Sequence, residues 1–293
     1  MGPIRRIVVA TDFSVGSDAA VERALQVARA HAASLDLLHV FDLSAWHSLR
    51  GVFDAKRLAG EVPPDLALRD RLRVLADSLA AQTQLEVSAS FEVGDAVPAI
   101  EAHVKKTSAS LLVLGVRADP EVPGLGSTAL KLLRAAPCPV LVVRPYSTQP
   151  YGNVLSAVDM RDVSERVADA AVTLFPVAQH RLFYAVDPQW QREVWRATGA
   201  QPAMQSMHES LHARAVHHLG QLAEALSVKT EHPVITEVVD AAPAHAVVAR
   251  AESLPADCVA VGHHGQGLLV ERLLGSTAQD LIHHTARDVL VVP

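Results

Sequence analysis

The sequence predicts an α/β protein made of two tandem, five-stranded, parallel, doubly wound domains. The chain has 293 residues, within one residue of twice 147, and about 100–200 residues per domain is usual. In each half, short β-branched runs alternate with longer amphipathic stretches, which is typical of successive βα units. Because the short runs are apolar on both faces, helices must cover both sides of each sheet.

An internal repeat supports the two-domain interpretation. Asp12 follows the apolar run Ile-Val-Val-Ala-Thr and matches Asp159 at an offset of 147. Gly115 ends another apolar run and matches Gly262 at the same offset. The Gly-Ser-Thr tripeptide that begins at Gly126 recurs at an offset of 149. The two copies therefore differ in length between the strand-end glycine and this tripeptide.

The pattern fixes the expected elements of each half in order. In the first half we expect strands near 5–10, 35–41, 85–91, 110–115 and 139–144, and helices near 16–32, 65–82, 95–107 and 127–136. In the second half we expect strands near 153–158, 179–186, 233–239, 257–262 and 288–292, and helices near 162–174, 203–227, 242–253 and 276–286. Turn-forming residues at 144–150 predict a linker, and so domains at 1–146 and 151–293.

The residues that follow the fourth strand of the second half form a glycine-rich loop. Gly262 lets the backbone turn and leaves room for a ligand, and Gly265 and Gly267 keep the loop open. The tripeptide at 275–277 then begins a helix, where unpaired N–H groups and two hydroxyls converge. In doubly wound sheets, ligands bind outside the carboxyl ends of the strands. The loop therefore predicts an anion site, most naturally for phosphates.

This loop is neither a Walker loop nor a dinucleotide fingerprint, because it lacks both G-x4-G-K-[ST] and G-x-G-x-x-G. Its spacing, G-x2-G-x9-G-[ST] after strand four, resembles the ATP-binding signature of the universal stress protein family. Further matching pieces are Val-Ala-Thr-Asp-Phe-Ser, Leu-Leu-His-Val, Leu-Leu-Gly-Ser-Thr and Pro-Val-Leu-Val-Val. Both halves resemble this family over nearly their whole length, and the family's fold is the Rossmann-like, adenine nucleotide alpha hydrolase-like one.

The resemblance implies that ATP lies across the carboxyl edge of the second half, and it leaves open whether Mg²⁺ accompanies the nucleotide. The matching positions are Asp159, Ala185, Gly262, Gly265, Gly275, Ser276 and Thr277. His263, His264, Gln266 and Arg272 would add donors to the phosphates. For His263 and His264, a solvated loop tip is the alternative interpretation.

The first half departs from this pattern in its loop. Ala118 replaces the second glycine, the spacer is two residues shorter, and two prolines enter. Asp119 and Glu121 would repel a triphosphate. For Asp12 and the Gly-Ser-Thr at 126–128 a structural role is therefore favoured, as a strand-end carboxylate and a helix cap. We expect one ATP per chain, in the second half.

Composition excludes several other functions. A formal net charge of −6 argues against nucleic acid binding. No apolar run approaches the roughly 20 residues that span a bilayer. The amino terminus lacks the apolar core of a secretory signal, so a cytoplasmic protein without membrane attachment is expected.

Neither a catalytic group nor a metal site is assigned. No G-x-S-x-G elbow is present. His208 and His212, four residues apart on an expected helix, could ligate zinc, but an exposed helix face explains them better. A nucleotide-dependent stress-response or regulatory binding protein is the leading hypothesis. The alternatives are a slow ATPase or nucleotide-transfer enzyme, and a scaffold that has lost ATP.

The partners beyond the nucleotide follow from the resemblance. It implies an intrachain pseudo-dimer, in which the last strands, Val140–Val143 and Val289–Val292, pair across the two halves. It leaves open whether two chains associate as a homodimer. The protein partner and the stress signal are not identified by the sequence.

Overall fold

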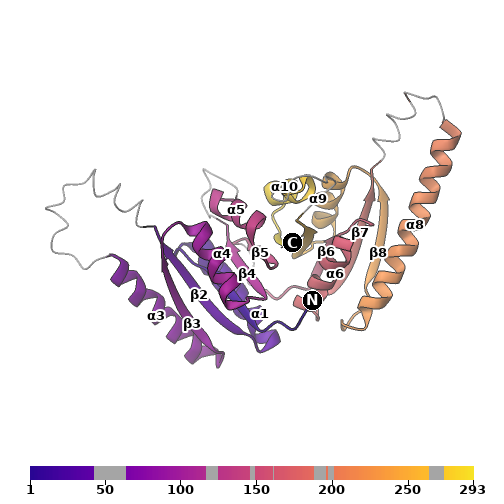
Figure 1. The fold of residues 1–293 in the computed structure, drawn as a ribbon. Helices are drawn as coiled ribbons and strands as arrows, with labels where there is room; N and C mark the ends of the chain where they lie inside the picture. The colour runs from indigo at the N-terminus through magenta and orange to yellow at the C-terminus, as the bar shows by residue number, and fades with distance from the viewer. Residues whose placement is uncertain are drawn as a thin grey trace. The chain divides into compact units, whose positions relative to one another are not determined.

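The computed structural model describes residues 1–42, 64–116, 125–145, 149–160, 162–187, 196, 201–263 and 274–293. The chain divides into two units (Figure 1). The first comprises Gly2–Thr148, and the second comprises Gln149–Pro293 together with Met1.

The N-terminal unit is a five-stranded parallel sheet with helices on both faces. Its strands are β1 (Arg6–Ala10), β2 (Ser34–Phe41), β3 (Val87–Val93), β4 (Leu111–Gly115) and β5 (Val140–Val143). Its helices are α1 (Val15–His31), α3 (Pro64–Thr83), α4 (Ala96–Thr107) and α5 (Ser127–Ala135). The strand order is β3-β2-β1-β4-β5, and every pair is parallel.

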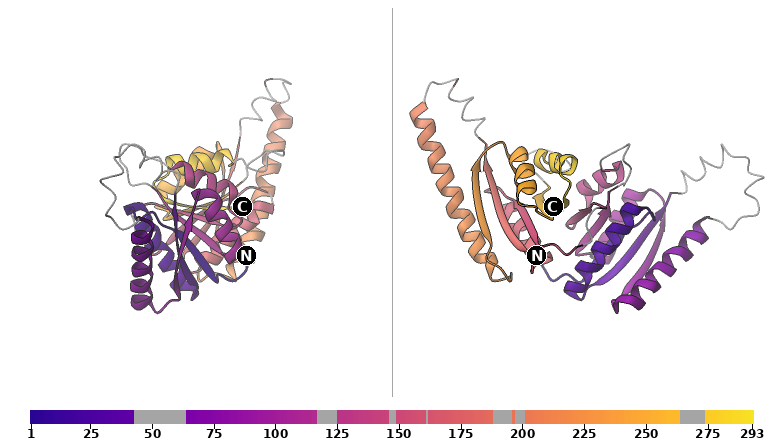
Figure 2. Two further views of the ribbon diagram at one scale, coloured as in Figure 1. Left: turned by 60° about the vertical axis from the view of Figure 1, so that its left-hand side comes forward. Right: turned by 180° about the vertical axis from the view of Figure 1, so that it is seen from behind.

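The C-terminal unit repeats this arrangement. Its strands are β6 (Asn153–Ala157), β7 (Gln179–Val186), β8 (Ile235–Asp240), β9 (Cys258–Gly262) and β10 (Asp288–Val292). Its helices are α6 (Asp162–Leu174), α8 (Gln201–Ser227), α9 (Pro243–Ser253) and α10 (Ser276–His284). The strand order β8-β7-β6-β9-β10 matches that of the first unit. Figure 2 shows the long helix α8 running beside β7 and β8.

The predicted fold class is confirmed, and two strands start two residues later than expected. Before β3, Gln84 has a φ of 59°, so the chain is still turning where the strand was expected to begin. Before β8, Pro233 has no N–H to donate to a strand ladder. Its carbonyl instead accepts a 2.7 Å hydrogen bond from the side chain of Gln179. Local backbone chemistry therefore delays both strands.

Two residues of β2 that point to opposite faces of the first sheet show which helix covers each face. His39 packs against the ring of Phe91, on the side where Arg69 of α3 lies over that ring. The carboxylate of Asp36 faces the other way and is 2.7 Å from Nε2 of His103 on α4. Side chains alternate between the faces of a strand. Helices α3 and α4 therefore lie on opposite faces, as doubly wound topology requires.

Gly115, at the end of β4, permits a close contact with α1. A Cβ at this position would lie 2.1 Å from the carbonyl oxygen of Gly16. Real Cβ atoms do not approach backbone so closely, so only glycine fits without displacing α1. The glycine that the sequence suggests as part of a phosphate loop thus has a packing role in the first unit.

Candidate functional site

The topology of the second unit identifies a switch point between β6 and β9. From β6 the chain proceeds to β7 and then β8 on one side, while β9 leads to β10 on the other. Crevices at the carboxyl ends of two such strands are where ligands bind in open α/β sheets. The residues just after β6 and β9 are therefore the ones to examine.

The strand register brings three predicted residues to one level of this edge. Ala157 pairs with Phe183, so Asp159, two residues on, is level with Ala185. Ser156 pairs with Ala260, so Asp159 and His263 each follow this last pair of β6 and β9 by three residues. Neighbouring strands lie about 4.8 Å apart. The structure thus gathers residues from three adjacent strands that are far apart in the sequence.

Asp159 is held by a serine that the sequence analysis did not single out. The hydroxyl of Ser164, in the first turns of α6, donates a 2.6 Å hydrogen bond to Oδ1 of Asp159. The same hydroxyl oxygen accepts the N–H of Asp159 at 2.5 Å. Ser164 is buried. Its counterpart at the offset of 147 is Ser17, which accepts a 3.1 Å hydrogen bond from Thr11. The internal repeat, which places a serine at both positions, is the sequence signal that could have identified Ser164.

His263 is buried, with only 5% of its surface exposed. Its N–H donates to the carbonyl of Val292 at 2.7 Å. Its carbonyl accepts the N–H of Gly275 at 2.9 Å. The solvated loop tip considered as an alternative is wrong for His263, because both of its backbone groups are tied to neighbouring segments. His263 instead anchors the residue that begins α10.

Helix α10 begins without a side-chain cap. Its N-cap residue, Gly275, is extended, with φ −61° and ψ 151°, and has no side chain with which to cap the first turn. The side chain of Gln279 donates to the carbonyl of Leu274 at 2.8 Å, which fixes the entry to the helix. Ser276 is exposed and Thr277 partly so. The N-cap glycine therefore offers no acceptor of its own to the first N–H groups, which lie at the positive end of the helix dipole, the end that favours an anion.

The remaining predicted residues lie outside the described part of the chain. These are His264, Gly265, Gln266 and Arg272 in the second half, and the prolines, carboxylates and Ala118 of the first-half loop. Their contribution to the site stays a prediction.

The first unit has the same helix start but a different strand edge. Gly126, the N-cap of α5, has φ −61° and ψ 154° and likewise makes no side-chain cap. Oδ1 of Asp12 accepts the N–H of Ser14 at 3.0 Å. Partial burial by itself would raise the pKa of Asp12, but hydrogen bonds involving Ser14 and Ser17 leave this pKa lower than usual. The Asp12 carboxylate thus accepts a hydrogen bond within the turn that it belongs to, which is consistent with a structural role for Asp12.

Beside Asp12 lies a cluster of rings and guanidinium groups that the sequence analysis missed. The rings of Phe13 and His39 are 4.9 Å apart, and those of His39 and Phe91 are 5.4 Å apart. Arg71 lies 4.4 Å from the centre of the Phe13 ring, and Arg69 lies 4.1 Å from that of Phe91. Burial lowers the pKa of His39, although its contact with the Thr11 carbonyl opposes this. No sequence period connects these residues, since they come from three strand ends and a helix.

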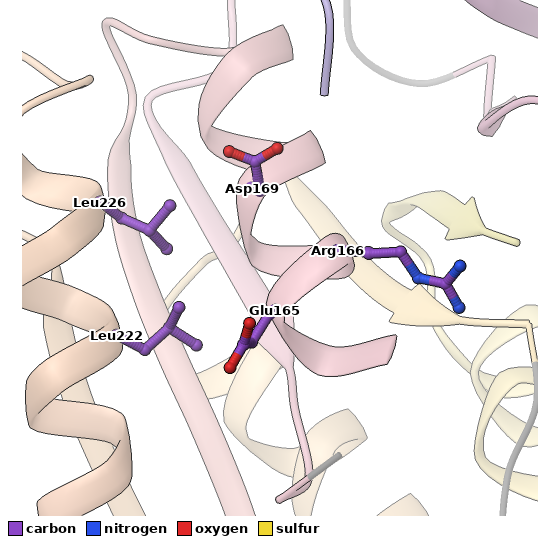
Figure 3. Close-up of a pocket in the computed structure, with 5 residues that line it drawn as sticks. All are labelled: Glu165, Arg166, Asp169, Leu222 and Leu226. Carbon is purple, nitrogen blue, oxygen red and sulfur yellow. The ribbon is translucent and has the colours of Figure 1, made fainter. Parts of the chain in front are cut away.

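The second unit also contains a cavity between two of its helices. It measures about 590 Å³ and lies between α6 and α8, where Leu222 and Leu226 extend from α8 toward α6 (Figure 3). The other residues that line it are Glu165, Arg166 and Asp169. Lys229 forms a 2.6 Å ion pair with Asp169 at its margin. The described residues that line this cavity include none of the predicted site residues.

The histidine pair considered for zinc has a local partner. Nε2 of His208 is 3.0 Å from Oδ1 of Asp240, and the rings of His208 and His212 are 6.5 Å apart. Over the described ranges, no three His, Cys, Asp or Glu side chains are grouped as metal ligands would be. The pair gives no support to a metal centre.

Two doubly wound parallel sheets in tandem, each followed after its fourth strand by a helix with a glycine N-cap, define a class of paired α/β domains. The model of the universal stress protein family matches residues 3–144 and again residues 150–293. The chain belongs to the universal stress protein family and carries two of its domains in tandem.

Similar proteins agree with this assignment. The chain is 29% identical over 146 residues to the universal stress protein YxiE of Bacillus subtilis, which covers 47% of this chain and 98% of that protein. Its fold is similar to a universal stress protein from Archaeoglobus fulgidus, with a TM-score of 0.69, 17% identity and 99% of both chains covered. It is also similar to a protein of unknown function from Pseudomonas aeruginosa, with a TM-score of 0.68, 20% identity, and 99% and 92% of the two chains covered.

The described helices give no membrane span. None of them is both long enough and apolar enough to cross a bilayer.

Proposed function

We propose that the second half binds ATP at the carboxyl edge of its sheet, and that occupancy of this site regulates binding to a protein partner. The observation that supports this most is the uncapped start of α10, where Gly275 is fixed to the carbonyl of His263 at 2.9 Å. The phosphates would accept hydrogen bonds from the first N–H groups of this helix and from Ser276 and Thr277.

The base and ribose would lie farther along the same edge, over β6 and β7. Asp159 stands there, level with Ala185, and Ser164 keeps its carboxylate in place. Ala185 is small and buried, so its side chain leaves the edge open to a flat ligand. His264, Gly265 and Gln266 belong to the proposed phosphate loop by their place in the sequence.

A regulatory role is favoured over catalysis because, among the described residues of this edge, we assign no base or nucleophile. The side chains of Ser164 and Asp159 are hydrogen-bonded to one another. The backbone groups of His263 are hydrogen-bonded to Val292 and Gly275. The test is to incubate the protein with ATP, with and without Mg²⁺, and to analyse the nucleotide that is recovered. Intact bound ATP after many hours supports a binding protein, whereas steady release of ADP or AMP would establish an enzyme.

A further inference from the structure

The cavity between α6 and α8 of the second unit has an apolar wall and a charged wall. Leu222 and Leu226 line it from α8, and Glu165, Arg166 and Asp169 line it from α6 (Figure 3). Its volume of about 590 Å³ falls within the range of roughly 300–1,000 Å³ that is usual for small-molecule pockets. The cavity is therefore large enough for a small ligand, and its two walls favour different parts of that ligand.

The apolar wall is a strip of leucine side chains held in place by the core. Leu226 is buried and belongs to one core cluster with Ala168 and Val172 of α6. Leu222 packs against the same cluster and remains partly exposed. Residues four apart on a helix are neighbours on one face, so the two leucines form a continuous surface. A hydrocarbon chain along this surface would remove further apolar area from water, which is favourable.

Two of the charged groups on the other wall are unsuited to holding a ligand against the leucines. Oδ1 of Asp169 is 2.6 Å from Nζ of Lys229, so this carboxylate already has a cation. The guanidinium of Arg166 is directed away from both leucines (Figure 3). Lys229 also shows which chemistry the acidic wall accepts, because its side chain is an aliphatic stem that ends in an ammonium group.

Glu165 is the charge left for a ligand. Its side chain is exposed, and along the helix pair it lies at the level of Leu222, whereas Asp169 lies beyond Leu226 (Figure 3). Within the part of the chain that the structure describes, Glu165 forms no side-chain hydrogen bond or ion pair. The leucine strip thus ends at a carboxylate that has no cation among these residues.

We propose that this cavity binds a small aliphatic amine. The hydrocarbon chain of the amine lies along Leu222 and Leu226, and its ammonium group meets the carboxylate of Glu165. A neutral alcohol of the same length gains only the apolar contact, and a carboxylate is repelled by Glu165. None of the residues proposed to bind ATP takes part, so this site does not depend on the proposed function.

The experiment compares three ligands that share one chain and differ in charge. Hexylammonium, hexanol and hexanoate are titrated into the full chain at low salt, because salt screens exposed charges. Binding is followed by NMR of leucine methyl groups. The signals of Leu222 and Leu226 are identified by their loss in Leu222→Ile and Leu226→Ile. The Kd of each ligand is taken from the movement of these signals.

Hexylammonium should move both leucine signals, with a Kd about two- to fivefold below that of hexanol, as an exposed ion pair allows. Hexanoate should bind most weakly. Glu165→Gln should make hexylammonium and hexanol equal, and Glu165→Lys should make hexanoate the preferred ligand. Asp18→Asn, the matched change at the offset of 147 on α1, should leave all three Kd values unchanged.

Three results would each overturn the proposal. The first is that hexylammonium at tens of millimolar leaves both leucine signals in place. The second is that hexanol or hexanoate binds the unmodified protein as tightly as hexylammonium does. The third is that the preference for hexylammonium persists in either Glu165 variant, once its thermal transition shows that it is folded. A chain that binds no ATP would refute the proposed function and leave these three measurements unaffected.

Discussion

The main-chain N–H of Gly275 donates a 2.9 Å hydrogen bond to the carbonyl oxygen of His263. This bond joins the residue that follows β9 to the N-cap residue of α10, and of the positions between them 264–273 lie outside the described residues. It fixes the base of the glycine-rich loop. The positive end of α10 is thereby held beside the switch point of the second sheet.

A negative charge at the start of α10 should weaken ATP binding without harming the fold. Ser276→Asp places a carboxylate on an exposed first-turn residue, where it favours the helix but repels phosphate. We expect at least a roughly tenfold rise in the Kd for ATP, measured by calorimetry. Ser127→Asp makes the same change at α5 and should leave this Kd within about twofold. Equal losses in the two variants would refute the assignment of ATP to the second half.

Removing the Ser164 hydroxyl should destabilise the second unit. Ser164→Ala deprives both the carboxylate and the N–H of Asp159 of a buried partner. A partner lost in this way costs about 1–3 kcal/mol. Urea denaturation measures this change in the free energy of unfolding. A loss below about 0.3 kcal/mol would mean that water replaces the hydroxyl without cost.

A methyl group at the end of β4 should disturb the first unit. In Gly115→Ala the new Cβ would meet the Gly16 carbonyl at 2.1 Å, and such overpacking costs about 1–3 kcal/mol. Gly126→Ala is the matched control, because its Cβ would meet nothing within 4 Å. The two variants are compared by chemical denaturation, and equal stabilities would show that α1 can move away from β4.

Acid should weaken the second unit through His180. Burial lowers the pKa of this fully buried histidine below 6.5, although its hydrogen bond to the Phe175 carbonyl opposes the shift. The unfolded chain therefore takes up a proton at a higher pH than the native one does. Its contribution to stability is complete above about pH 6.5 and is lost as the pH falls from there toward the native pKa.

The measurement for His180 is the free energy of unfolding as a function of pH between about 7.5 and 5. In His180→Gln the slope of the free energy of unfolding against pH should decrease by up to about 1.4 kcal/mol per pH unit, which corresponds to one proton. This holds even if the substitution also changes the overall stability. An unchanged slope would show that His180 does not titrate in this range.

The repeat and the alternation of apolar runs were enough to predict both sheets. They also led to Asp159, Ala185 and His263 as candidates for one edge, because parallel strands end on the same side; the role of these residues in a site stays a prediction. The burial of His263 could not be predicted, since it depends on the carbonyl of Val292, on a strand that lies 29 positions away in the sequence.

The cluster around Phe13 escaped prediction for a related reason. It needs the register between β2 and β3, and a slip of one residue would have turned His39 to the opposite face. Gly115 illustrates a different limit. Its place at a strand end is the same as that of Gly262, but the contact with Gly16 that explains it in the first unit arises from helix packing.

Counting the ATP molecules bound by the full chain tests the proposed function most directly. Calorimetry with the unmodified protein should give one ATP per chain, and at a hundredfold excess over Kd the nucleotide should stabilise the fold by about 2.7 kcal/mol. Two ATP per chain would contradict the assignment to the second half alone, and no binding together with no thermal shift would contradict ATP binding itself.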